Sequence, residues 1–181
     1  MSAFDQSGYQ VRLEWGVEGL ARLAPAHVVV LVDVLGDLDD ALVDAAVAAA
    51  PGGVVLRGGL VNASAVATAC LTIQHERADR TSVAIVAAGD GGRLAAEDLL
   101  GAGAVVAALS ERGTDHTSPE AAVACEAFVG LRRAVVHMVA ASGSGRRLAE
   151  QGRADEVTAA SRLDAEGDVP RWDGRAWVVD G

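Results

Sequence analysis

Four carboxylates crowd the end of an apolar run in the first quarter of the chain. The run, VVVLVDVLGDLDD, covers residues 28–40 and contains Asp33, Asp37, Asp39 and Asp40. In open α/β sheets ligands bind just beyond the carboxyl ends of the strands, so acids placed there can hold a divalent cation for phosphate chemistry. The same acids also suit a helix start, with Asp37 as the N-cap and Asp39 and Asp40 in the positively polarised first turn.

Asp33 differs from its neighbours because it falls inside the apolar run. An ionised carboxylate is costly among apolar side chains unless another group pairs with it, so a functional role is expected for this acid. A second pair, Glu97 and Asp98, falls in an expected helix behind the turn at residues 89–93. One of the two can point back toward the sheet edge as a metal ligand. The other interpretation of this pair is a solvated helix face.

Three glycine-containing turns, at residues 58–64, 89–93 and 142–147, fall where helices are expected to begin. Helix amino ends bind anions because their first N–H groups lack partners and the helix dipole is positive there. The third turn, SGSGRR, is the best phosphate candidate, since it combines two hydroxyls, flexible backbone donors and the guanidinium groups of Arg146 and Arg147. A plain helix cap followed by solvated arginines explains the same residues equally well.

Several familiar chemistries lack their sequence patterns. No GxxxxGK[ST] loop, dinucleotide fingerprint or GxSxG elbow occurs, so nucleotide binding by these loops and serine hydrolase chemistry are not supported. The four histidines are spread without paired spacing, which gives no support to a zinc site. Cys70 and Cys125 lie in helix-like Ala/Val contexts without metal-ligand spacing, and we expect buried free thiols in a reducing cytoplasm.

Short Val-rich runs alternate with Ala/Leu-rich amphipathic segments, which predicts an α/β protein: a layered fold with a central mixed or mostly parallel sheet flanked by helices. Trp172 and Trp177 flank Asp173-Gly174, a pattern that predicts a hairpin anchored by the two tryptophans. Because only 3% of the residues are aromatic, the core must consist of small aliphatic side chains in close helix-to-sheet contact. Strands are predicted at residues 11–15, 27–34, 53–56 and 82–88, with a further candidate at 104–108, and helices at 38–50, 63–76, 94–102, 119–131, 145–151 and 154–161.

The chain has 181 residues, of which 51% are apolar, and this is enough for one domain with a sizeable core. No internal repeat or long linker divides it, so residues 1–181 are expected to form a single domain. No apolar run approaches the roughly 18 residues of a membrane span and no leader pattern opens the chain, so we expect a cytoplasmic protein. The formal net charge of −10 disfavours binding to nucleic acid or to anionic membranes.

Five segments, taken in order along the chain, carry a family resemblance. They are VRLEWG, VVVLVDVL, NASAVATA, AAGDGGRLAAEDLLGAGAVV and SGSGRRLAEQGRADEVTAASRLDAEGDVPRWDGR. Together they resemble the 2-phosphosulfolactate phosphatase family, and the EDLLGAGA block and the SGxxL, LD and VP elements of the tail are the most specific parts. The resemblance implies an α/β fold and a Mg²⁺-dependent phosphatase that releases phosphate from 2-phosphosulfolactate.

The resemblance also implies roles for individual residues. The metal would neutralise phosphate charge and orient water, an arginine would stabilise the transition state, and the expected partner is a small anionic phosphoester. Pairing of Ala-rich helix faces into a homo-oligomer is compatible with this function. Position by position, the implied roles are catalysis for Asp33 and Arg146, substrate binding for Asn62, Ser64, Ser144 and Gly145, and Mg²⁺ binding for Asp33, Glu97 and Asp98.

The chain departs from the family pattern in two places. Where many members continue Asp-Val-Leu with an Arg or a Ser-Phe pair and then Thr-Thr, this chain has GDLDD at residues 36–40. Several dozen family residues, including two loops expected to hold the substrate, have no counterpart, because Pro51-Gly52-Gly53 leads almost directly into residues 54–58. The second hypothesis is therefore a catalytically inactive relative that serves as a binding or oligomer-forming protein.

Overall fold

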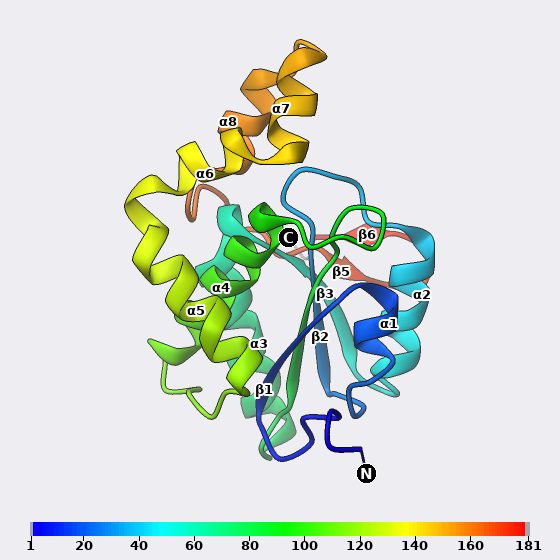
Figure 1. The fold of residues 1–181 in the computed structure, drawn as a ribbon. Coiled ribbons are helices and arrows are strands. Elements are labelled where there is room, and N and C mark those ends of the chain that lie inside the picture. The colour runs from blue at the N-terminus through cyan, green and yellow to red at the C-terminus, as the bar shows by residue number, and fades with distance from the viewer. Residues whose placement is uncertain (1, 180–181) are drawn as a thin grey trace.

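The computed structural model describes residues 2–179 and has three layers, with a central sheet between two layers of helices (Figure 1). The strand order is β1-β4-β2-β3-β5-β6. The first four strands in this order pair in parallel, whereas β5 pairs antiparallel with β3 and β6 antiparallel with β5. The mixed sheet confirms the predicted α/β fold. The strands are β1 (Val11–Trp15), β2 (Val28–Val32), β3 (Val54–Gly58), β4 (Val83–Ala87), β5 (Arg171–Trp172) and β6 (Trp177–Val178).

The helices divide between the two faces of the sheet and one end of it. α1 (Gly16–Leu20) and α2 (Asp40–Ala49) cover one face, and α3 (Ala63–Arg77), α4 (Ala96–Ser110) and α5 (Pro119–Leu131) cover the other. Figure 1 shows the remaining three helices rising beyond the end of the sheet to which the loop after β2 also leads. These are α6 (Val135–Ala141), α7 (Gly143–Glu150) and α8 (Ala154–Ala160), and short 3₁₀ turns at Leu60–Asn62 and Arg132–Ala134 precede α3 and α6.

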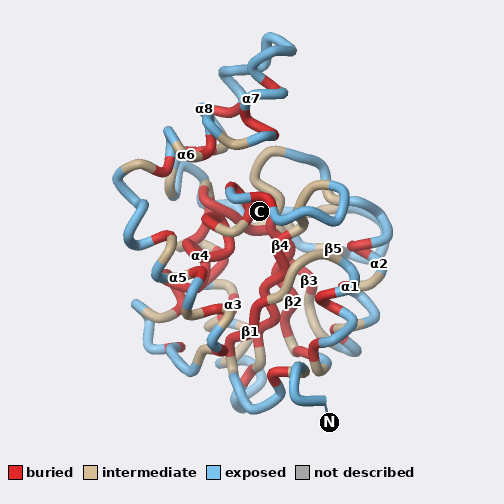
Figure 2. The backbone as a smooth tube through the Cα atoms, viewed as in Figure 1, coloured by how far each residue is buried: buried red, intermediate tan, exposed pale blue. Residues whose placement is uncertain are grey.

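The two central strands, β2 and β4, are buried along their whole length. Helices cover both of their faces, which is why both strands read as unbroken apolar runs rather than as alternating patterns. Figure 2 shows this buried centre as a red band between partly exposed helices. The end of β2 therefore delivers Asp33 to the point where the buried sheet meets solvent.

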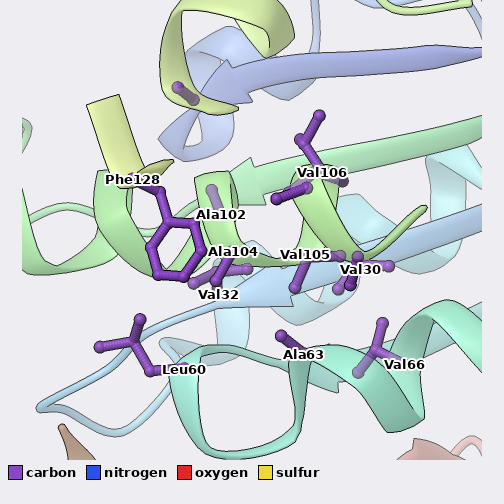
Figure 3. Packing of buried hydrophobic residues seen from close by; sticks show 14 of the residues in the cluster. Val30, Val32, Leu60, Ala63, Val66, Ala102, Ala104, Val105, Val106 and Phe128 are labelled. Atoms are coloured by element: carbon purple, nitrogen blue, oxygen red, sulfur yellow. The ribbon is translucent and has the colours of Figure 1, made fainter. Parts of the chain in front are cut away.

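The helix α4 packs unusually close to its neighbours because glycine occupies two contact positions. A Cβ atom at Gly101 would lie 2.8 Å from Val34 Cγ2, and one at Gly103 would overlap the backbone carbonyl of Ala124 in α5. Figure 3 shows the small side chains of α4 between those of β2 and Phe128 of α5. This confirms the expected close contact between helices and sheet.

Most predicted elements are present, and three predictions are wrong or incomplete. The candidate strand at residues 104–108 lies inside α4, because a helix buried on several sides is as apolar as a buried strand. α2 is capped by Asp39, whose side chain accepts a hydrogen bond from Ala41 N–H, and not by Asp37. The short helices α1 and α6 were not predicted.

The predicted C-terminal hairpin is confirmed and closes one edge of the sheet. The rings of Trp172 and Trp177 meet edge to face, with centroids 5.4 Å apart, and pack against the apolar cluster under α1 and α2. Asp173 shapes the turn by accepting hydrogen bonds from the N–H groups of Arg175 and Ala176. Within residues 2–179, no helix combines the length and the apolar character needed to cross a membrane.

Candidate functional site

A pocket of about 670 Å³ lies beyond the carboxyl ends of β1, β2 and β4, and we call it the strand-end pocket. This is where ligands bind in open α/β sheets, since loops that leave neighbouring parallel strands diverge there. The lining comes from several parts of the chain: the end of β1 with α1, the loops after β2 and β4, and residues of α2, α4 and α7. Its polar lining includes the carboxylates of Glu18, Asp33, Asp37, Asp39, Asp90, Glu97 and Asp98, the guanidinium groups of Arg22 and Arg147, and the hydroxyl of Ser144.

Asp98 joins two of these loops. It is only 2% exposed, and its Oδ1 and Oδ2 atoms accept hydrogen bonds of 2.9 Å from the backbone N–H groups of Val34 and Gly89. Val34 follows β2 and Gly89 follows β4, so one carboxylate fixes both loops at the pocket wall. Burial raises the pKa of Asp98 to about 7, and the nearby carboxylates of Asp33 and Glu97 add to the increase.

Glu97 precedes Asp98 in the first turn of α4 and is equally buried, at 3% exposed. Its carboxylate lines the strand-end pocket, yet it makes no hydrogen bond or ion pair with any residue among 2–179. Buried carboxylates are normally paired, because the loss of hydration is otherwise uncompensated. Glu97 therefore presents to the pocket a carboxylate that no described residue binds.

Asp33 is half-buried between the strand-end pocket and a smaller cavity beside β3. Burial raises its pKa, whereas Arg57 and the backbone N–H groups of Gly36 and Leu35 act in the opposite direction. The carboxylate lies directly over Gly36: a Cβ atom there would be 2.6 Å from Asp33 Oδ2. Glycine at position 36 thus leaves room for the acid.

The start of α7 supplies a polar wall opposite these acids. The side chain of Ser142 caps the helix by accepting a hydrogen bond of 3.0 Å from Gly145 N–H. Ser144 is 6% exposed and lines the pocket, and its hydroxyl makes no side-chain hydrogen bond with the described residues. Gly145 is buried outside the pocket lining, where a Cβ atom would overlap the carbonyl oxygen of Val139. Its place in the SGxxL element is explained by packing.

Arg147 reaches the pocket, whereas Arg146 is exposed on α7 and does not line it. The Nη1 atom of Arg147 lies 3.4 Å from Asp90 Oδ2, and the Nη2 atom of Arg93 lies 3.5 Å from the same oxygen. A tight turn at Gly91-Gly92, both with positive φ, brings Arg93 back beside Asp90. Asp90 therefore pairs with both arginines, of which Arg147 lines the pocket.

Asn62 lines the smaller cavity that Asp33 also borders, whereas Ser64 lines neither cavity, and both residues bind the tail of the chain. Asn62 is buried; its Oδ1 atom accepts a hydrogen bond from Gly59 N–H, and its Nδ2 atom donates to the carbonyl of Asp168. The N–H and hydroxyl groups of Ser64 each donate a hydrogen bond of 2.8 Å to the carboxylate of Asp164. These two family-like segments, which are about a hundred residues apart, thus hold each other.

The acids of the pocket suit a divalent cation in chemical type, since carboxylate oxygens are the ligands that Mg²⁺ prefers. Among residues 2–179, however, no group of three His, Cys, Asp or Glu side chains is arranged to enclose a metal. Mg²⁺ usually keeps several waters and takes one or two protein carboxylates together with substrate phosphate oxygens. The set of Glu97 and Asp33 fits that kind of open site.

Sequence reasoning missed Trp15 and Glu18 as residues of the pocket. It also selected Arg146 for catalysis, although Arg147 is the arginine of this pair that lines the pocket. Trp15 ends β1, and its buried Nε1 atom has no hydrogen-bond partner among the described residues. Its position as the last residue of a predicted strand was the available signal. The two cysteines are free, as expected, with Cys70 buried and Cys125 half-buried. Burial raises the pKa of Cys70 to about 12, so this thiol stays protonated.

Comparison with known proteins bears on these segments. No curated protein is similar enough to the chain to match it. The family model described as 2-phosphosulpholactate phosphatase matches residues 42–175, which include Glu97, Asp98 and the start of α7. Asp33 lies ahead of the matched segment. Because the match covers well over half of the 181 residues, the chain belongs to the 2-phosphosulfolactate phosphatase family.

Proposed function

We propose that the protein is a Mg²⁺-dependent phosphatase that hydrolyses a small anionic phosphoester, such as 2-phosphosulfolactate, in the strand-end pocket. One observation carries the proposal: the buried carboxylate of Glu97, without a protein partner, faces the same pocket as Ser144 and Arg147. A carboxylate on one side and anion-binding groups on the other match the two ends of a metal-bound phosphate.

The α7 side of the pocket binds the phosphoryl oxygens in this proposal. The hydroxyl of Ser144 and the unpaired N–H groups of the helix's first turn donate hydrogen bonds to them. Arg147 adds positive charge, which stabilises the phosphoryl group in the transition state. We give this role to Arg147 in place of Arg146, because only Arg147 lines the pocket.

The acidic side holds the cation and the water. Glu97 and Asp33 would bind Mg²⁺, which when bound neutralises phosphate charge and makes a water molecule more acidic. Asp33 takes the proton of the water that attacks phosphorus, the bond from phosphorus to the leaving oxygen breaks as the new one forms, and Asp33 then gives its proton to the leaving oxygen. Burial raises the pKa of Asp33 in the protein without the cation. Asp98 keeps both loops in place.

The second candidate is the catalytically inactive relative, and the connection between α2 and β3 favours it. Only four residues separate Ala49 from Val54, so this part of the chain has no room for the substrate loops of the family. The excess of acids over arginines in the pocket lining also opposes binding of a free phosphoester. Such a protein would bind a ligand or another copy of itself without turnover.

Phosphate release separates the two candidates. Purified protein is incubated with 2-phosphosulfolactate and with an aryl phosphate, in Mg²⁺ and in chelator, beside the variants Asp33→Asn and Glu97→Gln. If the protein is a Mg²⁺-dependent phosphatase, we expect phosphate release that requires Mg²⁺. The rate should fall by about 100-fold or more in each variant, with the melting temperature nearly unchanged. Turnover in chelator, or full activity in both variants, contradicts the proposed site. No turnover with either substrate, under conditions in which a full-length family member is active, favours the inactive relative.

A further inference from the structure

We infer that the divalent cation and the phosphoester bind the strand-end pocket cooperatively, so that each greatly strengthens binding of the other, and that Glu97 couples them. The inference rests on the proposed function and adds one property to it: the protein without substrate binds the cation weakly. Three features of the pocket lead to this conclusion.

The first feature is the solitary position of Glu97. Its side chain is 3% exposed, lines the pocket and makes no hydrogen bond or ion pair within residues 2–179. Its oxygens still reach the pocket, because neither is among the fully enclosed polar atoms that lack a partner in the described chain. Since no arginine, histidine or backbone N–H of the described chain binds this carboxylate, it can take a ligand from the pocket, and a cation is the ligand that a carboxylate attracts.

The second feature is the scarcity of further protein ligands for that cation. Both oxygens of Asp98 already accept backbone hydrogen bonds, at 2.9 Å each, so this residue acts as a clamp on the loops rather than as a free ligand. Asp33 offers one more carboxylate, which lies over Gly36. No three-residue ligand group exists in the part of the chain that the structure describes. Phosphoryl oxygens are the remaining way to complete an oxygen shell around Mg²⁺.

The third feature is the negative charge of the pocket lining, because of which phosphate binding depends on the cation as much as cation binding depends on phosphate. Seven carboxylates and two arginines line the pocket, and Arg147 is already paired with Asp90 at 3.4 Å. A phosphate dianion entering alone meets net repulsion, whereas a cation on Glu97 reverses the local field. By linkage, the factor by which phosphate strengthens cation binding equals the factor by which the cation strengthens phosphate binding.

Calorimetric titration tests the coupling without relying on turnover. Mg²⁺ is titrated into the protein with and without saturating inorganic phosphate, and phosphate is titrated with and without Mg²⁺, after correction for Mg²⁺–phosphate association in solution. We expect the Kd of each ligand to fall by about ten-fold or more in the presence of the other, and by the same factor in both directions. A change below about two-fold, or no Mg²⁺ binding in either arm, overturns the inference.

Two variants test the place of Glu97. Glu97→Gln keeps the size of the side chain and removes the charge, so the coupling should disappear. Glu150→Gln removes the same charge from the exposed end of α7 and should keep it. Coupling that survives in Glu97→Gln assigns the cation to other residues. Cooperative binding without phosphate release would reject the phosphatase function and support the coupling. Mg²⁺-dependent turnover, together with tight cation binding in the absence of phosphate, would support the phosphatase function and reject the coupling.

Discussion

The carboxylate of Asp98 holds the backbone of Val34: its Oδ1 atom accepts a hydrogen bond of 2.9 Å from the Val34 N–H group. The other oxygen does the same for Gly89. The start of α4 therefore fixes the ends of β2 and β4, and the strand-end pocket has its shape because of this one side chain.

Replacing Asp98 by alanine is expected to destabilise the fold. The change leaves two buried backbone N–H groups without acceptors, and it should lower the free energy of unfolding by about 3 kcal/mol at about pH 5.5. Urea unfolding in chelator measures the effect. Asp44→Asn, on the exposed side of α2, is the control and should change stability by less than about 0.5 kcal/mol. An Asp98→Ala variant as stable as the wild type would show that water replaces the carboxylate at no cost.

The cost of Asp98→Ala should shrink as the pH rises. The pKa of Asp98 is raised to about 7 in the folded protein from an ordinary value of 3.8, so between these values the folded state keeps a proton that the unfolded chain has released. The contribution of Asp98 to the free energy of unfolding of the wild type is therefore greatest at low pH and is lost as the pH rises through 7. Between about pH 5 and pH 8 the wild type should lose about 2 kcal/mol relative to the variant, which has no such group. Unfolding curves of both proteins across this range measure the difference, and a constant difference would contradict a raised pKa.

The two adjacent arginines of α7 should behave differently. Arg147 lines the pocket and Arg146 does not, so Arg147→Ala should lower kcat/KM by about 100-fold and Arg146→Ala by less than about two-fold. Steady-state kinetics with the best substrate of the phosphate-release assay measures both. The reverse order would return the catalytic role to Arg146, as the family resemblance implies.

Ser64 should matter for stability and not for substrate affinity. Its N–H and hydroxyl groups bind Asp164, away from the strand-end pocket, so Ser64→Ala and Asp164→Ala should each cost about 1 kcal/mol of stability and leave KM within about two-fold. The double variant should cost less than the sum, because both changes remove one interaction. A large increase in KM in Ser64→Ala alone would restore the predicted role of Ser64 in substrate binding.

Gly103→Ala should be among the most destabilising single changes in the chain. The added methyl group would overlap the carbonyl of Ala124, so α4 and α5 have to separate, at a cost of about 3 kcal/mol. Thermal unfolding measures this. Gly130→Ala in α5 is the matched control, because nothing lies within 4 Å of the new atom and helix propensity favours alanine.

The sequence was informative where one local rule decided the outcome. Val11–Trp15 and Pro119–Leu131 were predicted with their observed ends, because apolar and charged residues alternate in the first and a Ser-Pro cap begins the second. The stretch 104–108 was ambiguous, since α4 is covered on several sides and its buried residues lose the helical alternation. The five-residue helix α1 carries too few turns to show a period.

The same distinction applies to the pocket. Asp33, Glu97 and Asp98 could be selected because acids beside apolar runs are costly and because strand ends meet at one edge. What each acid does depends on contacts that no local pattern contains, such as the bonds from Asp98 to Val34 and Gly89. Polar residues beside glycine indicated Asn62 and Ser64 as ligand-binding, yet their partners lie in the tail, at residues 164 and 168.

The position of β4 between β1 and β2 bears on how the chain is made. β1 and β2 do not pair with each other, and both hydrogen-bond to a strand that follows them by some fifty residues or more. On a ribosome, the first two strands therefore emerge with open edges, which are sites of wrong pairing between chains. The pocket cannot begin to form until α4 has been synthesised, and it stays open on one side until α7 follows. Completion of the strand-end pocket is thus a late event in the folding of each molecule, and the order of the strands sets it.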